Sequence, residues 1–394
     1  MLTATLLIAA SAFAADDDAQ TDPGFLATLK TPPAEAQLDD LNVVNFGGDL
    51  VPFVGTSAVE PERTVRHLSL NLIGGYTYGI SGAEGSAGFN VETGFVHGVQ
   101  GAGGANVNLG VLRGAQGAGG FNYAGIVDGV QGSGGFNVSR TSVRGVQATG
   151  GFNLAGEAVD GVQAAGGFNV AREVRGGQGA GGANIAVGDL RGVQGAGGVN
   201  VVVGDVRGVQ AAGGVNVATG EVQGVQLGTL NVALEEARVQ VGVVNVAPNA
   251  DVALGLLNIM WEGRNHVDVW ADSQGFMYAG YKGGSRYVHN MYSVGVQTIG
   301  GEQTWSYGLG IGGHIPMAKR AAIDLDIMTH QINEGVRWCN YVNLLNQARA
   351  VLVLSPFENL GIYAGPTYDV RIQDSAQRFT VEGRPGVTAG IQLF

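Results

Sequence analysis

The chain has 394 residues, of which 69 are glycine and only 14% are charged. This glycine content far exceeds that of ordinary globular domains, and because the glycines show no period of three, collagen is excluded. Hydrophobic residues make up 45% of the chain, which argues against disorder of the whole. The formal net charge of -12 excludes the basic surface that nucleic-acid binding requires, so we expect no nucleic-acid partner.

The N-terminal segment has the composition of a secretory signal. Residues 1–15 are apolar, are too short to cross a bilayer, and end in a small-x-small site at residues 12–14. They predict a signal peptide over residues 1–14, although no Lys or Arg precedes the apolar run. The acidic, proline-containing residues 15–64 predict a flexible leader. Because Cys339 is the single cysteine, a disulfide within the chain is excluded.

Residues 81–262 form a tandem repeat with one Gln and one Asn as landmarks in each unit. The step is 15 or 16 residues through most of the array and falls to 14 or 13 at its end. Repeats this short bury no core of their own, so neighbouring units must stack on one another. The defining residues include Gln147, Asn153, Gln163, Asn169, Gln194, Asn200, Gln210, Asn216, Gln226 and Asn231.

A parallel β-solenoid and one large antiparallel β-barrel both fit this repeat. The spacing favours the solenoid, because Gln and Asn are six residues apart at Gln210 and Asn216 but five apart at Gln226 and Asn231. Loss of one residue inside a continuous strand would turn every later side chain to the opposite face, whereas a corner absorbs it. The glycine-rich segment between the landmarks therefore indicates a corner, and the array predicts a solenoid of about 11 rungs.

The solenoid interpretation assigns directions to the side chains of each rung. We expect an apolar interior formed by residues such as Val225, Leu227, Leu230 and Val232, with the Asn residues near a bend. The Gln column would then face solvent, where it could contact a repetitive ligand such as a polysaccharide. The acidic turn residues, Asp205 among them, are expected to be solvated and not to bind calcium.

Residues 263–394 predict an antiparallel, barrel-like β domain. Candidate strands alternate apolar and polar residues, and the alternating run over residues 65–80 predicts one further strand, which gives eight in total. In this arrangement the repeats are an insertion after the first barrel strand and are displayed outside the cell. The candidate strands of the last segment span residues 270–281, 287–299, 304–315, 321–331, 343–354, 360–372 and 386–394.

The same alternation places polar residues on one face of these strands. In residues 321–330 the apolar side chains face one side and the acidic ones the other. A metal or hydrolytic cluster inside the barrel is one interpretation, and the ordinary polar filling of a small barrel is the other. We expect the second, with no cofactor, no metal and no catalytic residue. The candidate cluster comprises His289, His314, Asp324, Asp326 and His330.

The repeat over residues 224–233 resembles a bacterial surface-repeat family with tandem GVQxGxxNVA units and a C-terminal outer-membrane-type β region. The resemblance covers residues 66–394, and the segments 67–76, 308–316, 343–346 and 364–368 support it. It implies an exported, surface-associated protein, and it carries over no functional residues.

These observations predict a non-enzymatic protein of the cell surface or outer membrane with a structural, adhesive or ligand-contact role. Its expected partners are the outer membrane and a polysaccharide or other surface ligand. The alternative is an outer-membrane pore or barrel enzyme in which the repeats are barrel strands. A periplasmic or secreted location is the alternative to membrane association.

Overall fold

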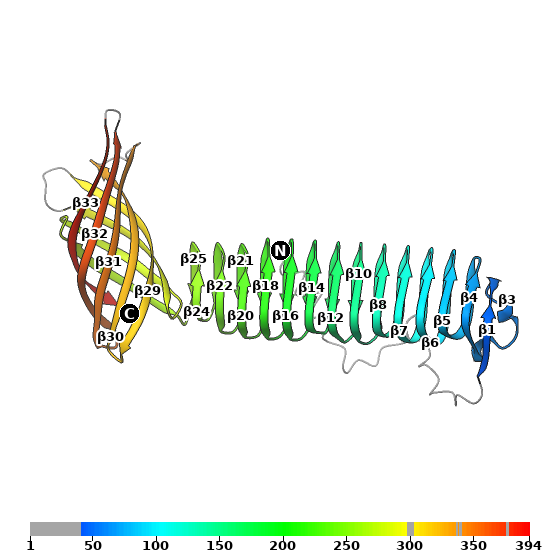
Figure 1. The fold of residues 1–394 in the computed structure, drawn as a ribbon. Helices are drawn as coiled ribbons and strands as arrows, with labels where there is room; N and C mark the ends of the chain where they lie inside the picture. Colours follow the sequence, from blue (N-terminus) through cyan, green and yellow to red (C-terminus); the bar gives the residue numbers. More distant parts are fainter. Residues whose placement is uncertain (1–40, 298–302, 336–337, 339–340, 376–377) are drawn as a thin grey trace, which may run out of the picture. The chain divides into compact units, whose positions relative to one another are not determined.

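The computed structural model describes residues 41–297, 303–335, 338, 341–375 and 378–394, so the predicted signal peptide and residues 15–40 of the predicted leader lie outside the described residues. The fold combines a parallel β-solenoid of about 12 turns with a closed barrel of eight antiparallel strands (Figure 1). The predicted fold class is therefore confirmed. One large antiparallel barrel is wrong, because the repeats pair with one another in parallel. Internal contacts divide the chain into two units, Met1–Gln223 and Gly224–Phe394.

The first unit begins with short elements that cover the edge of the first coil. They are β1 (Asn42–Gly47), β2 (Asp49–Val51), β3 (Val54–Gly55) and the 3-10 turns η2 (Thr56–Ala58) and η3 (Pro61–Arg63). Strand β1 pairs in parallel with β4 (Thr64–Asn71), which satisfies the backbone groups of an otherwise open sheet edge. The prediction of a flexible leader up to residue 64 is therefore corrected for its described part.

The predicted barrel strand over residues 65–80 belongs instead to the solenoid. It divides into β4 and β5, and β5 pairs in parallel and in repeat register with β6, so that Gly75 lies opposite Asn90. The segment is thus the first repeat unit, and its backbone groups bond to the next coil. The long strands of these first coils are β5 (Gly74–Ser86), β6 (Phe89–Ala102), β7 (Ala105–Ala118) and β8 (Phe121–Ser133).

From β9 onward each coil has two separate strands, a short one that contains the Asn landmark and a longer one that contains the Gln, which is replaced by Ala253 in the last coil. The other landmarks lie opposite their equivalents in the next coil, as for Gln147 and Gln163. The corner predicted between the landmarks is present as a break between the two strands. The strands are β9 (Phe136–Ser139), β10 (Val143–Thr149), β11 (Phe152–Ala155), β12 (Ala158–Ala165), β13 (Phe168–Ala171), β14 (Glu173–Ala180), β15 (Ala183–Ala186), β16 (Leu190–Ala196), β17 (Val199–Val202), β18 (Val206–Ala212), β19 (Val215–Ala218) and β20 (Val222–Leu227).

A glycine inside the longer strand is required by its backbone. Gly208 has φ of +149°, and a Cβ built there would lie 1.9 Å from the carbonyl oxygen of Gly192 in the preceding coil. No other residue type fits this conformation and this contact. The recurring glycine thus allows the coils to stack at the spacing of a parallel sheet.

The second unit contains the last coils and the complete barrel. The last coils comprise β21 (Leu230–Ala233), β22 (Ala237–Val241), β23 (Val244–Ala247), β24 (Ala250–Leu254) and β25 (Leu257–Met260). The barrel comprises β26 (Arg264–Asp272), β27 (Phe276–Gly284), β28 (Val288–Gln297), β29 (Thr304–Ala318), β30 (Ala321–Glu334), β31 (Val342–Phe357), β32 (Leu360–Ser375) and β33 (Arg378–Leu393).

Strand β26 closes the barrel by pairing with β33, with Val267 opposite Leu393. The predicted number of eight strands is therefore found, but with a different membership. The predicted strand over residues 270–281 merges the end of β26 with the start of β27, because the tight turn between them does not interrupt the alternation. Gly275 at this turn has φ of +84°. Among the described residues no helix is long and apolar enough to cross a membrane.

The last coil is hydrogen-bonded to the end of the barrel where β26 begins. The backbone N–H of Arg286 donates to the Ala250 carbonyl at 2.8 Å, and Asn290 Nδ2 donates to the Gly255 carbonyl at 2.9 Å. Asn258, the last Asn landmark, donates to Asn290 of β28. The interior Asn column of the solenoid therefore continues into the barrel.

Candidate functional site: the barrel lumen and the solenoid interior

The barrel lumen contains an ion-pair network at the centre of the predicted polar cluster. Asp324 contacts Lys282 Nζ at 2.5 Å and His314 Nδ1 at 2.6 Å. Asp326 contacts His289 Nε2 at 2.7 Å and Arg349 Nε at 2.9 Å. The two carboxylates are fully or almost fully buried, and each bonds to a cationic side chain, which is the condition for burying a charge.

Strand register explains which residues meet. Asp324 and Asp326 lie opposite His314 and Gly312, and the absence of a side chain at Gly312 leaves space for His289 and Asp326 to meet. The predicted separation of apolar and acidic side chains on the two faces of β30 is confirmed, since Leu325 and Ile327 are 49% and 64% exposed while Asp324 and Asp326 are buried.

His330 does not join the network. Its Nε2 lies 3.1 Å from Ser293 Oγ, and its ring lies 4.8 Å from that of Tyr278. It therefore belongs to a second, more apolar layer of the lumen. The buried apolar side chains of the lumen form one cluster, which contains Trp270, Tyr278, Phe276, Met291, Met328, Ile332, Leu345, Val351, Val353 and Tyr363.

Sequence reasoning missed the two cations that complete the network. Lys282 lies at the end of β27, beyond the boundary of the merged strand prediction, and Arg349 is the single charged residue in an apolar stretch of β31. The Arg349 guanidinium also lies 5.1 Å from the Trp270 ring centre and 5.6 Å from that of Tyr363, so it links both layers of the lumen. A single charged residue at a position of an alternating strand that points into the barrel is the sequence signal that could have identified these cations.

The lumen network is suited to holding the barrel together. Within the described residues no group of three or more His, Cys, Asp or Glu side chains is arranged to hold a metal ion. The carboxylates of Asp324 and Asp326 are engaged in ion pairs with Lys282 and Arg349 and in contacts with His314 and His289.

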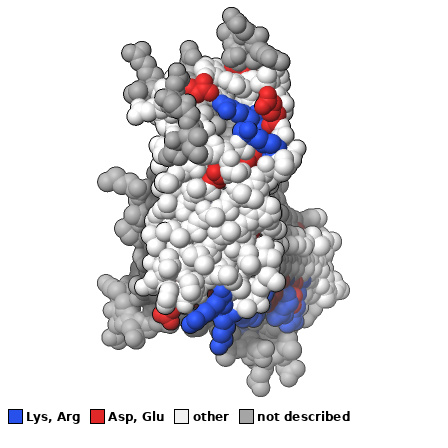
Figure 2. All heavy atoms as spheres, turned by 90° about the vertical axis from the view of Figure 1, so that its left-hand side faces the viewer, with Lys and Arg blue, Asp and Glu red and all other residues white. Residues whose placement is uncertain are grey.

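The outer surface of the barrel is mostly apolar, whereas its lumen contains the buried charged side chains. On the face in Figure 2, charged side chains lie toward the two ends and a band of uncharged residues lies between them. Exposed apolar side chains come from every barrel strand, and they include Val267, Met277, Val294, Val296, Leu309, Ile311, Leu325, Ile327, Leu352, Leu354, Ile362, Val387, Ile391 and Leu393.

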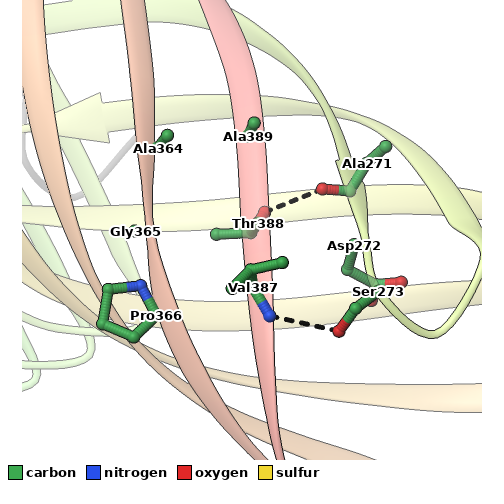
Figure 3. Close-up of a pocket in the computed structure, with 9 residues that line it drawn as sticks. All are labelled: Ala271, Asp272, Ser273, Ala364, Gly365, Pro366, Val387, Thr388 and Ala389. Atoms are coloured by element: carbon green, nitrogen blue, oxygen red, sulfur yellow. Dashed lines mark hydrogen bonds between the residues drawn. The ribbon is translucent and has the colours of Figure 1, made fainter.

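A hollow in this outer wall lies over β26, β32 and β33 (Figure 3). Its lining is mostly small or apolar, and its hydroxyls already bond to backbone: Thr388 Oγ1 donates to the Ala271 carbonyl at 3.0 Å, and Ser273 Oγ accepts from the Val387 N–H at 3.1 Å. Asp272 accepts from two backbone N–H groups of its own turn. The hollow therefore offers shape without reactive groups.

The solenoid interior is built from the landmark amides. Asn153 Nδ2 donates to Asn169 Oδ1 and to the Ala164 carbonyl, both at 2.8 Å. Gln163 Nε2 donates to Gln147 Oε1 at 2.8 Å. These amides form two ladders that run from coil to coil, and the Asn ladder also satisfies carbonyls at the corner.

The expected side-chain directions are therefore corrected. The inward residues of one coil are Val222, Gln226, Asn231 and Ala233, each fully buried. Val225, Leu230 and Val232 are partly exposed, and Leu227 is 41% exposed. A polysaccharide site on a solvent-facing Gln column is excluded, because all ten Gln and Asn residues that define the repeat are buried: Gln147, Asn153, Gln163, Asn169, Gln194, Asn200, Gln210, Asn216, Gln226 and Asn231. The interior is narrow, and its corner carbonyls require amide donors that apolar residues do not supply.

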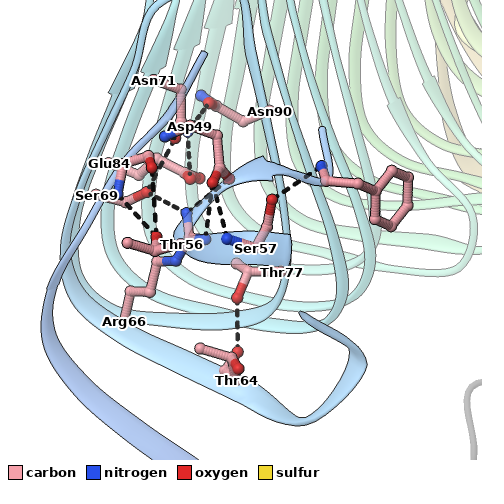
Figure 4. Close-up of polar contacts among 12 residues, drawn as sticks. Asp49, Thr56, Ser57, Thr64, Arg66, Ser69, Asn71, Thr77, Glu84 and Asn90 are labelled. Atoms are coloured by element: carbon pink, nitrogen blue, oxygen red, sulfur yellow. Dashed lines mark hydrogen bonds and ion pairs between the residues drawn. The ribbon is translucent and has the colours of Figure 1, made fainter. Parts of the chain in front are cut away.

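Charged and carboxyl groups replace the amides where the ladders begin (Figure 4). Arg66 forms a fully buried ion pair with Asp49 at 3.0 Å. Asn71 Nδ2 donates to Glu84 Oε1 at 2.9 Å and to Asn90 Oδ1 at 3.0 Å. Asn71 is thus the first member of the Asn ladder. These residues form the N-terminal cap network of the solenoid.

One coil further in, two carboxyl groups meet the end of the Gln ladder. Gln100 Nε2 donates to Glu84 Oε2 at 2.9 Å and also to Glu92. Burial raises the pKa of Glu92 well above its ordinary value, and the nearby Glu84 raises it further. Burial and the neighbouring carboxyl group thus both favour the protonated form of Glu92.

No protein-family model matches the chain, and neither the curated proteins nor the solved structures include a significant match. The resemblance to a bacterial surface-repeat family thus stays a prediction. The arguments on function that follow rest on the geometry of the barrel and of the solenoid.

Proposed function

We propose that this protein is an outer-membrane β-barrel protein in which the barrel is a membrane anchor and the solenoid is a non-enzymatic scaffold. The observation that carries the proposal is the inverted polarity of the barrel. Leu309, Ile311 and Ile327 are 58%, 41% and 64% exposed on its outer wall, whereas Lys282, Asp324 and Arg349 are buried in its lumen. Lipid-facing apolar side chains and an inward polar set are typical of transmembrane barrels.

Aromatic side chains near the two ends of the strands support the membrane assignment. Near the end with the longer loops, Trp305, Tyr307 and Trp338 contact one another, with ring centres 4.8 Å apart for the two tryptophans. At the other end Tyr281 and Phe357 are 45% and 67% exposed. Rings of this kind lie at the level of lipid headgroups in transmembrane barrels.

An anchor fits the lumen better than a pore or an enzyme does. A pore requires a continuous water-filled path, whereas here the ion pairs of Asp324 and Asp326 and the aromatic layer around Tyr278 fill successive levels of the lumen. The repeats form a parallel solenoid, which also removes the basis for the predicted pore or enzyme built from repeat strands.

The lengths of the barrel connections favour the periplasm as the location of the solenoid. At the end where β26 begins, the connections have three, two and two residues, over 285–287, 319–320 and 358–359. The opposite end has two short connections, over 273–275 and 376–377, and the two longest of the barrel, over 298–303 and 335–341. Short turns of outer-membrane barrels face the periplasm and longer loops face outward. The solenoid enters the barrel at the short-turn end, so we infer a periplasmic solenoid and not the surface display expected from the sequence.

Membrane fractionation and gel mobility of the full chain test the anchor. We expect recovery in the outer-membrane fraction and a faster-migrating form in unheated detergent samples, because folded barrels resist unfolding by the detergent. A matched variant pair strengthens the test: Ile327→Arg introduces a charge on the outer wall and should reduce membrane assembly, whereas Lys319→Ser in a turn should not. Recovery of the wild-type chain as a soluble periplasmic species would overturn the proposal.

A further inference from the structure

One outer face of the solenoid in the first unit is apolar and free of charge. It is formed by the residues on either side of each buried Asn landmark, which point outward from the short strands. The positions on either side of the Asn carry no charge from β6 to β19, whereas the following strand segments of these coils carry an Arg and Asp column, as in the pair Arg175 and Asp160 at 3.4 Å. Of these positions Val201 is buried and the others are at least partly exposed. The column before the Asn is Phe89, Ala105, Phe121, Phe136, Phe152, Phe168, Ala183, Val199 and Val215, and the column after it is Val91, Val107, Tyr123, Val138, Leu154, Val170, Ile185, Val201 and Val217.

The phenylalanines make this face regular. Phe121, Phe136, Phe152 and Phe168 stack with ring centres 4.8 to 5.0 Å apart and with ring planes within 5° of parallel. Stacking covers the flat sides of the rings and leaves their outer edges accessible, and Phe168 is 42% exposed. The face is therefore pre-organised, and binding to it costs little side-chain entropy.

The dimensions of the face meet the requirement of a stable interface. From the row of Phe89 to the row of Val215 there are nine rungs, and their eight spacings of about 4.8 Å give a length of about 38 Å. A four-residue strand is about 13 Å wide, so the face covers roughly 500 Å². Two such faces together reach the roughly 1,000 Å² expected of a specific protein–protein interface. Soluble surfaces rarely expose so large an apolar patch without a partner.

We propose that this face pairs with the same face of a second copy of this chain. The faces complement each other under a two-fold axis parallel to the stack of coils. The rotation places the column before the Asn of one copy opposite the column after the Asn of the other. Phe136, Phe152 and Phe168 then lie opposite the smaller Val138, Leu154 and Val170. Large and small side chains then interdigitate, as in packed β-sheets. The absence of charge removes any electrostatic basis for choosing an acidic or basic partner, and the absence of Lys and Arg from the face disfavours a lipid surface.

The pairing of the faces does not depend on the proposed membrane anchor. The parallel direction follows from the complementarity of the two columns, and the anchor is compatible with it, since two barrels in one membrane would hold their solenoids on the same side. A failure of membrane assembly would therefore leave the pairing intact, and a monomeric but membrane-inserted protein would overturn only the pairing.

The mass of the full chain, measured by light scattering after size exclusion in detergent and in amphipol, tests the pairing. We expect two copies per particle for the wild type and one copy for Phe152→Glu, which places a carboxylate at the centre of the interface. The control Val162→Glu makes the same kind of change at a 45% exposed residue of the longer strand and should keep two copies.

The milder variant Phe152→Ser tests the pairing if Phe152→Glu does not fold, and circular dichroism measures the β content of each variant. We expect at least a tenfold weaker association for Phe152→Ser. A wild type with one copy per particle in both media, or a Phe152→Glu variant that stays folded and keeps two copies, would overturn the pairing. A wild type with one copy that binds neutral lipid vesicles through this face, as judged by loss of binding in Phe152→Glu, would assign the face to lipid instead.

Discussion

Replacement of a single Asn in the ladder should destabilise the solenoid far more than the loss of an exposed apolar side chain. Asn153 Nδ2 donates to Asn169 Oδ1 and the Ala164 carbonyl at 2.8 Å and more weakly to the Gln147 carbonyl, and Asn153 Oδ1 accepts from Asn137 at 3.0 Å. Asn153→Ala therefore removes the donor from two close acceptors, the buried Asn169 amide oxygen and the part-buried Ala164 carbonyl. Each orphaned group costs about 1–3 kcal/mol, so we expect a loss of about 2–5 kcal/mol in the free energy of unfolding.

Asn153→Asp tests more directly whether the donor group of Asn153 is required. Asn153→Asp keeps the shape and the acceptor but places a carboxylate next to the Asn169 and Ala164 oxygens, so it should cost more than Asn153→Ala at neutral pH. At acidic pH the protonated carboxyl regains one donor, and the difference should shrink.

Denaturant unfolding followed by circular dichroism, together with hydrogen exchange of the neighbouring coils, measures these effects. Val162→Ala, at an exposed site of the same repeat, should change stability by less than about 0.5 kcal/mol. Equal unfolding midpoints for Asn153→Ala and Val162→Ala would refute the reasoning that the ladder stabilises the solenoid.

Three further predictions concern the cap, the coil backbone and the lumen. Burial raises the pKa of Glu92 above its ordinary value of 4.5, so the folded chain binds more protons at this residue than the unfolded chain does. The stability of the cap network should therefore fall as the pH rises above that value. Glu92→Gln should remove this pH dependence, as measured by hydrogen exchange across a pH series. Gly208→Ala, whose Cβ would lie 1.9 Å from a carbonyl oxygen, should lower the thermal midpoint strongly, whereas Gly195→Ala, with nothing within 4 Å, should leave it nearly unchanged. Asp326→Asn leaves the buried Arg349 without its carboxylate, and we expect a loss of about 3–5 kcal/mol, seen as a lower temperature of the shift in gel mobility; an unchanged temperature would contradict a stabilising role for the lumen network.

The repeat architecture was accessible from the sequence because it depends on spacing. The change from six to five residues between landmarks, at Gln226 and Asn231, is compatible with a corner and not with a continuous strand. The structure places that corner where expected, and the parallel register of β10 and β12 follows from the same repeat.

Side-chain direction was not accessible from hydropathy. The ordinary rule placed Val225 and Leu227 inside and Gln226 at the surface, whereas the structure has the opposite arrangement. The reason is the narrow interior, in which each amide both fills space and satisfies a neighbouring amide or a corner carbonyl, as Gln240 does with Gln226 at 2.8 Å. A column of identical amides at every repeat is the signal that indicates such a ladder.

In the barrel, alternation identified the faces but not the boundaries. The turn around Gly275 keeps the alternating pattern, so the pattern predicts one strand where the structure has β26 and β27, and residues 65–80 make up the predicted number of eight. Because the observed membership places the solenoid at the short-turn end of the barrel, we propose a periplasmic location in place of the predicted surface display. The four residues His289, His314, Asp324 and Asp326 were grouped correctly, while Lys282 and Arg349 became visible only once strand register was known.

Labelling of single cysteines with a membrane-impermeant maleimide tests the central claim, a membrane-spanning barrel that holds the solenoid at its short-turn end. In a Cys339→Ser background, Gln303→Cys lies in a long connection, Lys319→Cys lies in a short turn and Glu157→Cys lies in a solenoid turn. In intact cells we expect labelling of Gln303→Cys alone, and labelling of all three after the outer membrane is permeabilised. Labelling of Glu157→Cys in intact cells, with Gln303→Cys protected, would contradict the account.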